Sequence, residues 1–433
     1  MIMETVEGDF ASGHLADGKH SESPGTAARL LFLSHEASRT GAPIFLLNFL
    51  RWFRRNRCFD MRILTGRPGV LTEDFARIGM VDSFEPSAAV WYRAMRKLRL
   101  QHRYDSNHFA QLRQRYLKEK FDLMYVNSVA SARMLEFLSF VECPVVCHVH
   151  ELAGAIAEIG VRSIARLEER SPVYIAVSHA VKNNLVTNHR ISEDRIKVIH
   201  GFVPSTQSAI EAEAARKIVC GKLGIRQNAN LVCACGSIEF RKGTDIFLQV
   251  AGEVVRKYDG APVHFVWVGG RSDRVEIMQA RVANFGLRDV VHFVGLTSDA
   301  EMYFKASDMF ILTSREDPFP LVVMEAAQQE KPILCFANAG GAPEFVEADA
   351  GFVIPGFDVD GMVDKVIELL SSPGLRGRMG LAARNKVLSR YNLNLGAARV
   401  AGVIETAIAN CSDKDRGLSI RGYAHDSPGV SVR

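Results

Sequence analysis

Short apolar runs alternate along the chain with longer segments in which apolar residues recur every three or four positions. The short runs have the length of buried strands, and the longer segments have the period of amphipathic helices. Strands that are apolar throughout are typical of a parallel sheet covered by helices, which also provide the crossovers. The first series of runs lies at 28–34, 61–66, 121–127, 144–150, 172–178 and 196–200, and the second at 231–237, 263–269, 290–295, 308–314, 332–336 and 351–354.

The alternation stops near residue 205, in the Pro- and Ala-rich passage GFVPSTQSAIEAEAA, and then restarts. We therefore predict an α/β protein with two Rossmann-like, doubly wound domains, 27–204 and 205–390, which face a central cleft. Residues 391–411 are predicted to form a helical segment that can return to the N-terminal domain. The segments 1–26 and 412–433 lack apolar periodicity and are predicted to be disordered tails.

The composition excludes several classes of protein. With 47% hydrophobic and 24% charged residues among 433, the chain can bury a sizeable core. A net charge of +4 without a dense run of Lys and Arg does not indicate a nucleic-acid partner. No apolar stretch approaches the roughly 18 residues of a membrane-spanning helix, and the start, MIMETVEGDF, lacks the order of a signal peptide. We therefore expect a soluble, cytoplasmic protein whose eight cysteines stay reduced.

Ligands of open parallel sheets bind beyond the carboxyl ends of the strands, so the residues after each run carry the candidate chemistry. After the run at 308–314, Asp317 lies in the predicted turn and a helix begins near Leu321. The free N–H groups and the dipole of a helix start suit a phosphate. The carboxylates of Asp317 and Glu325 suit the hydroxyl groups of a sugar and a ribose. This combination indicates a nucleotide sugar.

This segment resembles the signature of the retaining family-four glycosyltransferases (glycosyltransferase group 1), in which two acids eight positions apart flank an apolar helix start. Here the acids are Asp317 and Glu325. The resemblance covers about residues 28–410 and implies a GT-B fold, with the acceptor on the N-terminal domain and the nucleotide sugar on the C-terminal domain. It implies that Asp317 contacts the donor sugar and Glu325 the ribose. The diphosphate and the sugar would meet N–H groups of the segment at 319–322, which contains Phe319, Pro320, Leu321 and Val322.

The first acid of this signature is usually Glu, so neighbouring Glu316 stays an alternative to Asp317. A second element, GSIEFRKG at 236–243, resembles the glycine-then-Lys-Gly element of the family. This resemblance makes Lys242 the cation that stabilises the departing diphosphate. Because Ser237 stands where many members carry Arg, Arg241 is the second candidate cation.

Two elements of the first domain are predicted to face the cleft. The small-residue loop before the helix at 44–53 contains Gly41, which matches a glycine of the family, and Ala42, which replaces a second one. His150 ends the run at 144–150, where the family carries a His near the reacting sugar. The resemblance therefore places Gly41 and His150 beside the donor.

The run CPVVCHVH at 143–150 also suggests zinc, because Cys and His at short spacing are zinc ligands. On an extended strand, however, Cys143 and Cys147 lie about 13 Å apart on one face, and His148 and His150 point to the other. These side chains cannot complete one tetrahedral site. We therefore expect no metal site.

Three smaller features can be explained as helix caps. Ser178 resembles a serine of the family and is expected to cap a helix near the cleft. Glu344, after the flexible Gly340 and Gly341, resembles an acid near the nucleotide, and a capping role is equally consistent with its position. Asp358 precedes the helix MVDKVIELL, so helix capping explains the DVD triplet better than metal binding.

A dehydrogenase is disfavoured because neither domain carries a G-x-G-x-x-G turn after its first strand. The sequence instead predicts a retaining, metal-independent hexosyl- or related glycosyltransferase that needs no cofactor besides its nucleotide-diphosphate sugar donor. A GT-B nucleotide-sugar epimerase and a non-catalytic nucleotide-sugar-binding subunit are the alternatives. No nucleophile of the glycosidase type is evident, so no covalent intermediate is expected.

The acceptor is expected to be a glycan, a lipid-linked sugar or another molecule that no motif identifies. The segment at 91–103, if helical, places Trp91 and Met95 on one side and Arg96, Lys97 and Arg99 on the other. This pattern suits anionic lipid headgroups, and it suits somewhat better a helix docked on its own domain with a solvated basic face. Peripheral attachment to the cytoplasmic face of a membrane is therefore the second expectation for localisation.

Overall fold

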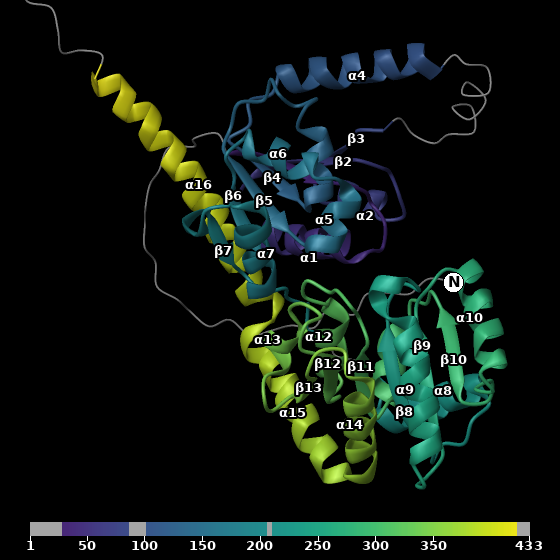
Figure 1. The fold of residues 1–433 in the computed structure, drawn as a ribbon. Helices are drawn as coiled ribbons and strands as arrows, with labels where there is room; N and C mark the ends of the chain where they lie inside the picture. Colours follow the sequence, from purple (N-terminus) through teal and green to yellow (C-terminus); the bar gives the residue numbers. More distant parts are fainter. Residues whose placement is uncertain (1–27, 86–100, 206–209, 422–433) are drawn as a thin grey trace, which may run out of the picture.

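The computed structural model of the protein describes residues 28–85, 101–205 and 210–421. Each of its two parallel sheets is covered by helices (Figure 1). The seven-stranded N-terminal sheet has the order β3-β2-β1-β4-β5-β6-β7, and the six-stranded C-terminal sheet has the order β10-β9-β8-β11-β12-β13. This architecture confirms the prediction of two Rossmann-like, doubly wound domains.

The elements of the N-terminal domain follow the predicted apolar runs, and β3 adds a strand that the sequence did not indicate because it is short and half polar. The strands are β1 (Arg29–Ser34), β2 (Asp60–Thr65), β3 (Met80–Ser83), β4 (Leu123–Asn127), β5 (Val145–Val149), β6 (Val173–Ala176) and β7 (Ile196–Val198). The helices are α1 (Gly41–Asn56), α2 (Thr72–Ala76), α4 (Gln101–Leu117), η1 (Val129–Met134), α5 (Ala153–Ile159), α6 (Arg162–Glu168), α7 (His179–His189) and η2 (Glu193–Arg195).

The C-terminal domain repeats the same alternation, and each predicted run is a strand. The strands are β8 (Asn230–Cys235), β9 (Val263–Val268), β10 (Val291–Gly295), β11 (Met309–Leu312), β12 (Ile333–Phe336) and β13 (Gly351–Ile354). The helices are α8 (Ala212–Leu223), η3 (Phe240–Lys242), α9 (Thr244–Lys257), α10 (Ser272–Asn284), α11 (Ala300–Ala306), α12 (Leu321–Gln328), α13 (Ala342–Val346), α14 (Val359–Ser371), α15 (Pro373–Arg390) and α16 (Leu393–Arg421).

Helix α16 leaves the C-terminal domain and packs on the N-terminal domain (Figure 1). Its fully buried Ala397, Val400 and Ile404 belong to the same core as Phe32 of β1. Asn394 accepts a hydrogen bond of 2.9 Å from the indole of Trp52 in α1. The helix continues to Arg421, beyond the boundary at 411 that the sequence predicted, so part of the predicted disordered tail is helical.

Several predictions fall on residues outside the described part of the chain. These are the disordered tail at 1–26, the end of the second tail at 422–433, and most of the amphipathic segment at 91–103. The junction near 205 adjoins residues 206–209, which are also outside it. Within the described residues, no helix combines the length and the apolar character that crossing a membrane requires.

The strand order of each sheet shows where ligands of such folds bind. The order reverses between β1 and β4 in one sheet and between β8 and β11 in the other. Loops that leave the two strands at such a reversal run in opposite directions and open a crevice beyond the sheet. The residues that follow β1, β4, β8 and β11 therefore occupy the crevices of the two domains.

Candidate active site

The crevice of the C-terminal domain contains a close ion pair. Lys242 follows β8 and Asp317 follows β11, and the Lys242 Nζ lies 2.5 Å from the Asp317 Oδ2. Both side chains are largely buried, with 15% and 6% of their surfaces exposed. The hydroxyl of Ser314 lies 3.4 Å from the same carboxylate oxygen. The structure thus brings together the predicted cation and the predicted first acid, which are distant in the sequence.

Two glycines allow the loops of this pair to approach each other. Gly243 has a φ of +68°, and a Cβ at this position would lie 1.9 Å from the carbonyl oxygen of Thr313. Gly340 has a φ of +122°, and its Cβ would lie 2.0 Å from the carbonyl oxygen of Asp317. Side chains at either position would push the loops apart. The backbone of Asp317 is held between Ala339 and Gly341 by hydrogen bonds of 2.6 and 3.1 Å.

Arg241 holds the loop that follows β11 by hydrogen bonds to its backbone. Its Nη1 donates a hydrogen bond of 2.9 Å to the carbonyl oxygen of Glu316, and its own carbonyl oxygen accepts one of 2.8 Å from the N–H of Arg315. The guanidinium of Arg315 in turn binds both oxygens of Asp245 at 2.7 and 2.6 Å. Of the two predicted cations, Lys242 is therefore the one that contacts the candidate first acid.

Glu316 and Asp317 point to different partners, although they are adjacent in the sequence. The carboxylate of Glu316 accepts hydrogen bonds of 2.8 and 3.1 Å from the N–H groups of Gly154 and Ala155, at the start of α5 in the other domain. Because Asp317 faces Lys242 and Glu316 caps a helix across the domain interface, the geometry favours Asp317 as the acid of the crevice.

The segment at 319–325 builds the start of α12. Phe319 is buried against the rings of His200 and Tyr391, Pro320 is the N-cap residue, and Leu321 and Val322 form the first turn. The first N–H groups of a helix have no partner within it, so they are available to an anion.

Glu325 lies on α12 and is partly buried. Burial, with a smaller contribution from the charge of Glu301, raises its pKa to about 7. Burial, and to a smaller extent the charge of Glu325, raises the pKa of the Cys235 thiol at the end of β8 to about 12.

In the N-terminal domain, Asn127 joins the predicted residues. Its amide donates a hydrogen bond of 3.0 Å to the carbonyl oxygen of Ala42, next to Gly41, and its Oδ1 lies 3.0 Å from the His150 Nε2. Gly41 is the exposed first residue of α1. The ends of β1, β4 and β5 are thus connected at the crevice of this domain. Sequence reasoning missed Asn127, although it directly ends an apolar run.

His150 is held in its neutral form. Burial, and to a smaller extent the charge of His35, lowers its pKa to about 3. Its ring stacks on His148 at 4.5 Å, which confirms that the two histidines share one face of the strand. His148 is fully buried with its Nδ1 2.5 Å from the hydroxyl of Tyr125, so it packs in the core. At neutral pH, His150 can exchange hydrogen bonds but carries no charge.

Two of the predicted caps, Ser178 and Asp358, are present, and Ser178 also joins the domains. Ser178 accepts a hydrogen bond from the N–H of Val181 in α7 and donates one of 2.7 Å to the carbonyl oxygen of Pro318. Asp358 accepts from the N–H of Gly361, which confirms helix capping.

Glu344 caps a helix of the opposite domain instead of its own. Its carboxylate accepts hydrogen bonds of 2.9 and 2.9 Å from the N–H groups of His179 and Ala180, and it lies 2.7 Å from the His200 Nε2. Burial raises the pKa of Glu344, but these hydrogen bonds outweigh burial and the net pKa is lowered. Sequence reasoning could not assign this partner because a sequence does not show which helix start lies opposite.

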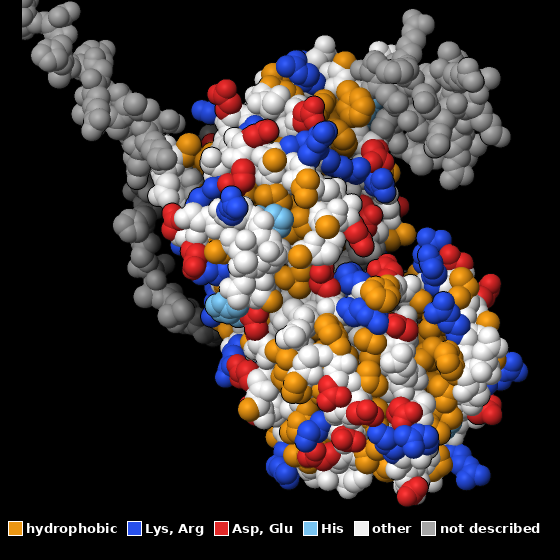
Figure 2. Space-filling view, in the orientation of Figure 1, with side chains coloured by type: hydrophobic (Ala, Val, Ile, Leu, Met, Phe, Trp, Pro, Cys, Tyr) orange, Lys and Arg blue, Asp and Glu red, His pale blue; other side chains and the backbone are white. Residues whose placement is uncertain are grey.

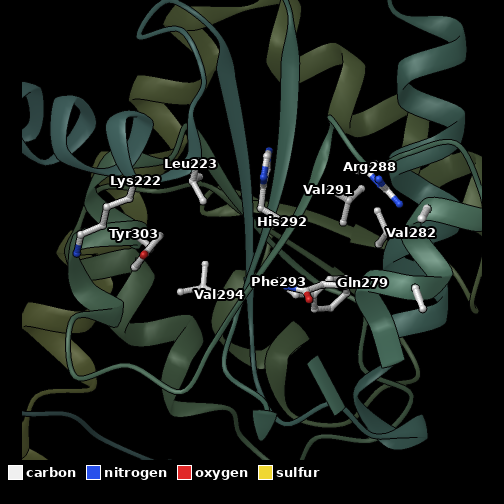
Figure 3. A pocket seen from close by; sticks show the side chains of 12 residues that line it. Lys222, Leu223, Gln279, Val282, Arg288, Val291, His292, Phe293, Val294 and Tyr303 are labelled. Carbon is white, nitrogen blue, oxygen red and sulfur yellow. The ribbon is translucent and has the colours of Figure 1, made fainter. Parts of the chain in front are cut away.

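The described residues line two cavities, and only the smaller one adjoins these elements. One of about 310 Å³ lies between the domains and is lined by residues on both sides, among them Leu152, Asn184, Glu316 and Gly340. Another of about 690 Å³ lies at the edge strand β10, with Lys222 and Arg288 on opposite sides of it (Figure 3). The larger cavity contains none of the predicted site residues, so volume alone does not locate the candidate site. Acidic and basic side chains are intermixed on the visible face of both domains (Figure 2).

Comparisons with known proteins point to one group of enzymes. Residues 216–386 match the family model described as glycosyl transferases group 1, and residues 39–207 match the model of glycosyltransferase family 4. The D-inositol 3-phosphate glycosyltransferase of Streptomyces scabiei is 27% identical over 260 residues, which are 58% of this chain and 56% of that protein. The alpha-D-kanosaminyltransferase of Streptomyces kanamyceticus is 27% identical over 199 residues, 45% of this chain and 50% of that protein. The chain thus spans about half the length of these relatives.

Among solved structures, Anabaena Alr3699/HepE in complex with UDP-glucose superimposes with a TM-score of 0.71 at 18% identity. The superposition covers 87% of this chain and 99% of that protein. At this identity, the likeness concerns the fold alone, and it confirms the GT-B architecture.

We predict that Gly340→Ala destabilises the protein by about 1 to 3 kcal/mol, because it strains the backbone that holds Asp317. The matched control is Gly377→Ala, in the exposed interior of α15, where a Cβ would meet nothing within 4 Å. That substitution should stabilise the protein by about 0.4 to 1 kcal/mol. Chemical denaturation of both variants checks this, and equal stabilities would contradict the described loop contact.

Proposed function

We propose that this chain, which belongs to the group 1 and family 4 glycosyltransferases, transfers a sugar from a nucleotide-diphosphate sugar to an acceptor with retention of anomeric configuration. The observation that carries the proposal is the Lys242–Asp317 pair at the crevice of the C-terminal domain, directly before the start of α12. The crevice offers a cation and a helix start, which suit the negative charge of a diphosphate. It also offers a carboxylate, which suits the hydroxyl groups of a sugar.

Lys242 is proposed to stabilise the negative charge that develops on the departing diphosphate. Because its ammonium is largely buried, its attraction to a phosphate is screened less than it would be in water. The N–H groups of Leu321 and Val322 and the dipole of α12 are proposed to add to it. Lys242 and the N–H groups of α12 then provide the charge stabilisation that a metal ion provides in other transferases, so we propose that the transfer needs no metal.

The two acids are proposed to bind hydroxyl groups. Asp317, displaced from Lys242 by the diphosphate, would accept hydrogen bonds from the donor sugar, and Glu325 would accept them from the ribose. Glu316 is committed to the start of α5, so its proposed contribution is to hold the loop of Asp317 against the other domain.

The N-terminal domain is proposed to present the acceptor. Neutral His150, fixed by Asn127, can hydrogen-bond the reacting sugar, and the exposed Gly41 allows close backbone approach. No residue is proposed as a covalent nucleophile, and the leaving diphosphate takes the proton of the acceptor hydroxyl. The acceptor is a glycan, a lipid-linked sugar or a small molecule. Attachment to the cytoplasmic face of a membrane is a separate proposal that rests on residues 91–103.

We predict that Lys242→Ala lowers turnover about tenfold to a hundredfold or more, which corresponds to ~1.5 to 3 kcal/mol of lost transition-state stabilisation. Lys222→Ala is the control, because this lysine is 48% exposed on α8 and should leave turnover near normal. The measurement is release of nucleotide diphosphate in an excess of acceptor and of EDTA. Near-normal turnover of Lys242→Ala would reject its role, and a requirement for Mn²⁺ would reject metal independence. Epimerised donor without acceptor would point to an epimerase instead.

The raised pKa of Glu325 predicts a pH dependence of donor binding. Below about 7 its carboxyl group is protonated, and above this pH it is ionised and accepts stronger hydrogen bonds from the ribose. The dissociation constant of the donor should therefore fall as the pH rises through about 7, by up to about tenfold per unit. Calorimetric titrations at several pH values measure this, with Glu325→Gln as the variant whose affinity should not vary. The same pH dependence in that variant would assign it to another group.

A further inference from the structure

We propose that His179, His200 and Glu344 form a binding site for a divalent transition metal ion of the Zn²⁺ class, which joins the two domains. The three side chains come from segments that are distant in the sequence. His179 begins α7, His200 follows β7, and Glu344 lies on α13 in the C-terminal domain. A metal ion held by all three would have ligands on both sides of the domain interface.

The distances bring the three groups within reach of one ion. One ligand atom from each residue lies within 4.8 Å of the other two. The His200 Nε2 and a carboxylate oxygen of Glu344 are 2.7 Å apart. Ligand atoms around a tetrahedral ion with bonds of about 2.0 Å are roughly 3.3 Å apart, so small side-chain rotations suffice. The His200–Glu344 hydrogen bond would be replaced by two bonds to the ion.

The donor set determines which ions fit. Two imidazole nitrogens with one carboxylate are ligands that Zn²⁺, Co²⁺ and Ni²⁺ accept, whereas Mg²⁺ and Ca²⁺ require oxygen ligands. With three protein ligands, the fourth position of a tetrahedral ion is left for water. His179 is exposed, so this position and the path of entry face the solvent.

The surroundings hold two of the ligands in place. Both oxygens of Glu344 accept N–H hydrogen bonds at the start of α7, and each oxygen keeps a further lone pair for an ion. The ring of His200 packs against Phe319 at 5.1 Å and Tyr391 at 5.7 Å. Such outer contacts orient metal ligands and reduce the ordering that binding requires. The ring of His179 lies 5.7 Å from that of His200 and completes the group.

Occupation of this site would link the domains. Glu344 already connects α13 to the start of α7 by hydrogen bonds, and an ion would add bonds to two residues of the N-terminal domain. Because Phe319 packs on the His200 ring, the bound ion would also restrict the segment that precedes α12. A bound ion would therefore favour the arrangement in which the two crevices face each other. The ion itself would not contact the Lys242–Asp317 pair.

The test is calorimetric titration of the full-length chain, after treatment with chelator, with Zn²⁺ alone. We expect one ion per chain and a concentration-dependent rise in the melting temperature. Co²⁺ bound at the site should give visible d–d absorption. His200→Gln and Glu344→Gln should each weaken binding by about tenfold or more. His179→Gln, at an exposed position, should do the same without disturbing the fold.

The control is His292→Gln, which removes one member of the His264–His292 pair in the C-terminal sheet. In this pair the His264 Nδ1 lies 3.1 Å from the His292 Nε2. Zn²⁺ binding should be unchanged in this variant. The proposal is overturned if the wild type binds no Zn²⁺, or if His179→Gln binds it as tightly as the wild type. Loss of Zn²⁺ binding in His292→Gln would assign the site to the His264–His292 pair and would also overturn the proposal. None of these measurements involves sugar transfer, so they do not depend on the proposed function.

Discussion

The candidate site depends on one constraint: two loops that leave neighbouring strands must come close enough to hold Lys242 and Asp317 in contact. A largely buried charge is unstable without a partner, so each member of the pair holds the other in the crevice. The approach is possible only because Gly243 and Gly340 leave room for carbonyl oxygens of the facing loops. On the proposed function, a diphosphate that replaces Asp317 as the partner of Lys242 keeps the ammonium paired, and the hydroxyl groups of the donor sugar then become the partners of the Asp317 carboxylate. The proposal therefore places the diphosphate of the donor at this pair.

The same loops hold the domains together. Glu316, adjacent to Asp317, caps α5, and Pro318 accepts a hydrogen bond from Ser178 at the start of α7. Glu344 caps α7 from the next loop. Carboxylates at helix starts are favourable because they compensate the helix dipole and satisfy free N–H groups. These hydrogen bonds connect the segment around Asp317 to the domain that carries His150 and Gly41, so we expect a movement of that segment to affect both domains.

Much of the fold could be predicted from the sequence because buried parallel strands are apolar along their whole length. Strand β3 was missed because four half-polar residues at a sheet edge give no such signal, and α16 was predicted too short because its last turns lack apolar periodicity. The position of Lys242 and Asp317 followed from their place after two strands. The partners of Glu316 and Glu344 could not be predicted, because they depend on how the domains meet. Likewise, His179, His200 and Glu344 share no spacing that would indicate a common site.

The central claim is that Asp317 binds the sugar of the donor and Lys242 its diphosphate. Calorimetric titration of wild type and Asp317→Asn with UDP and UDP-glucose, and with GDP and GDP-mannose, tests it most directly. We expect Asp317→Asn to bind the bare nucleotide as tightly as the wild type or more tightly, because Lys242 is released, and to bind the nucleotide sugar more weakly by comparison. Equal weakening of both ligands, or no difference between variant and wild type, would contradict the account.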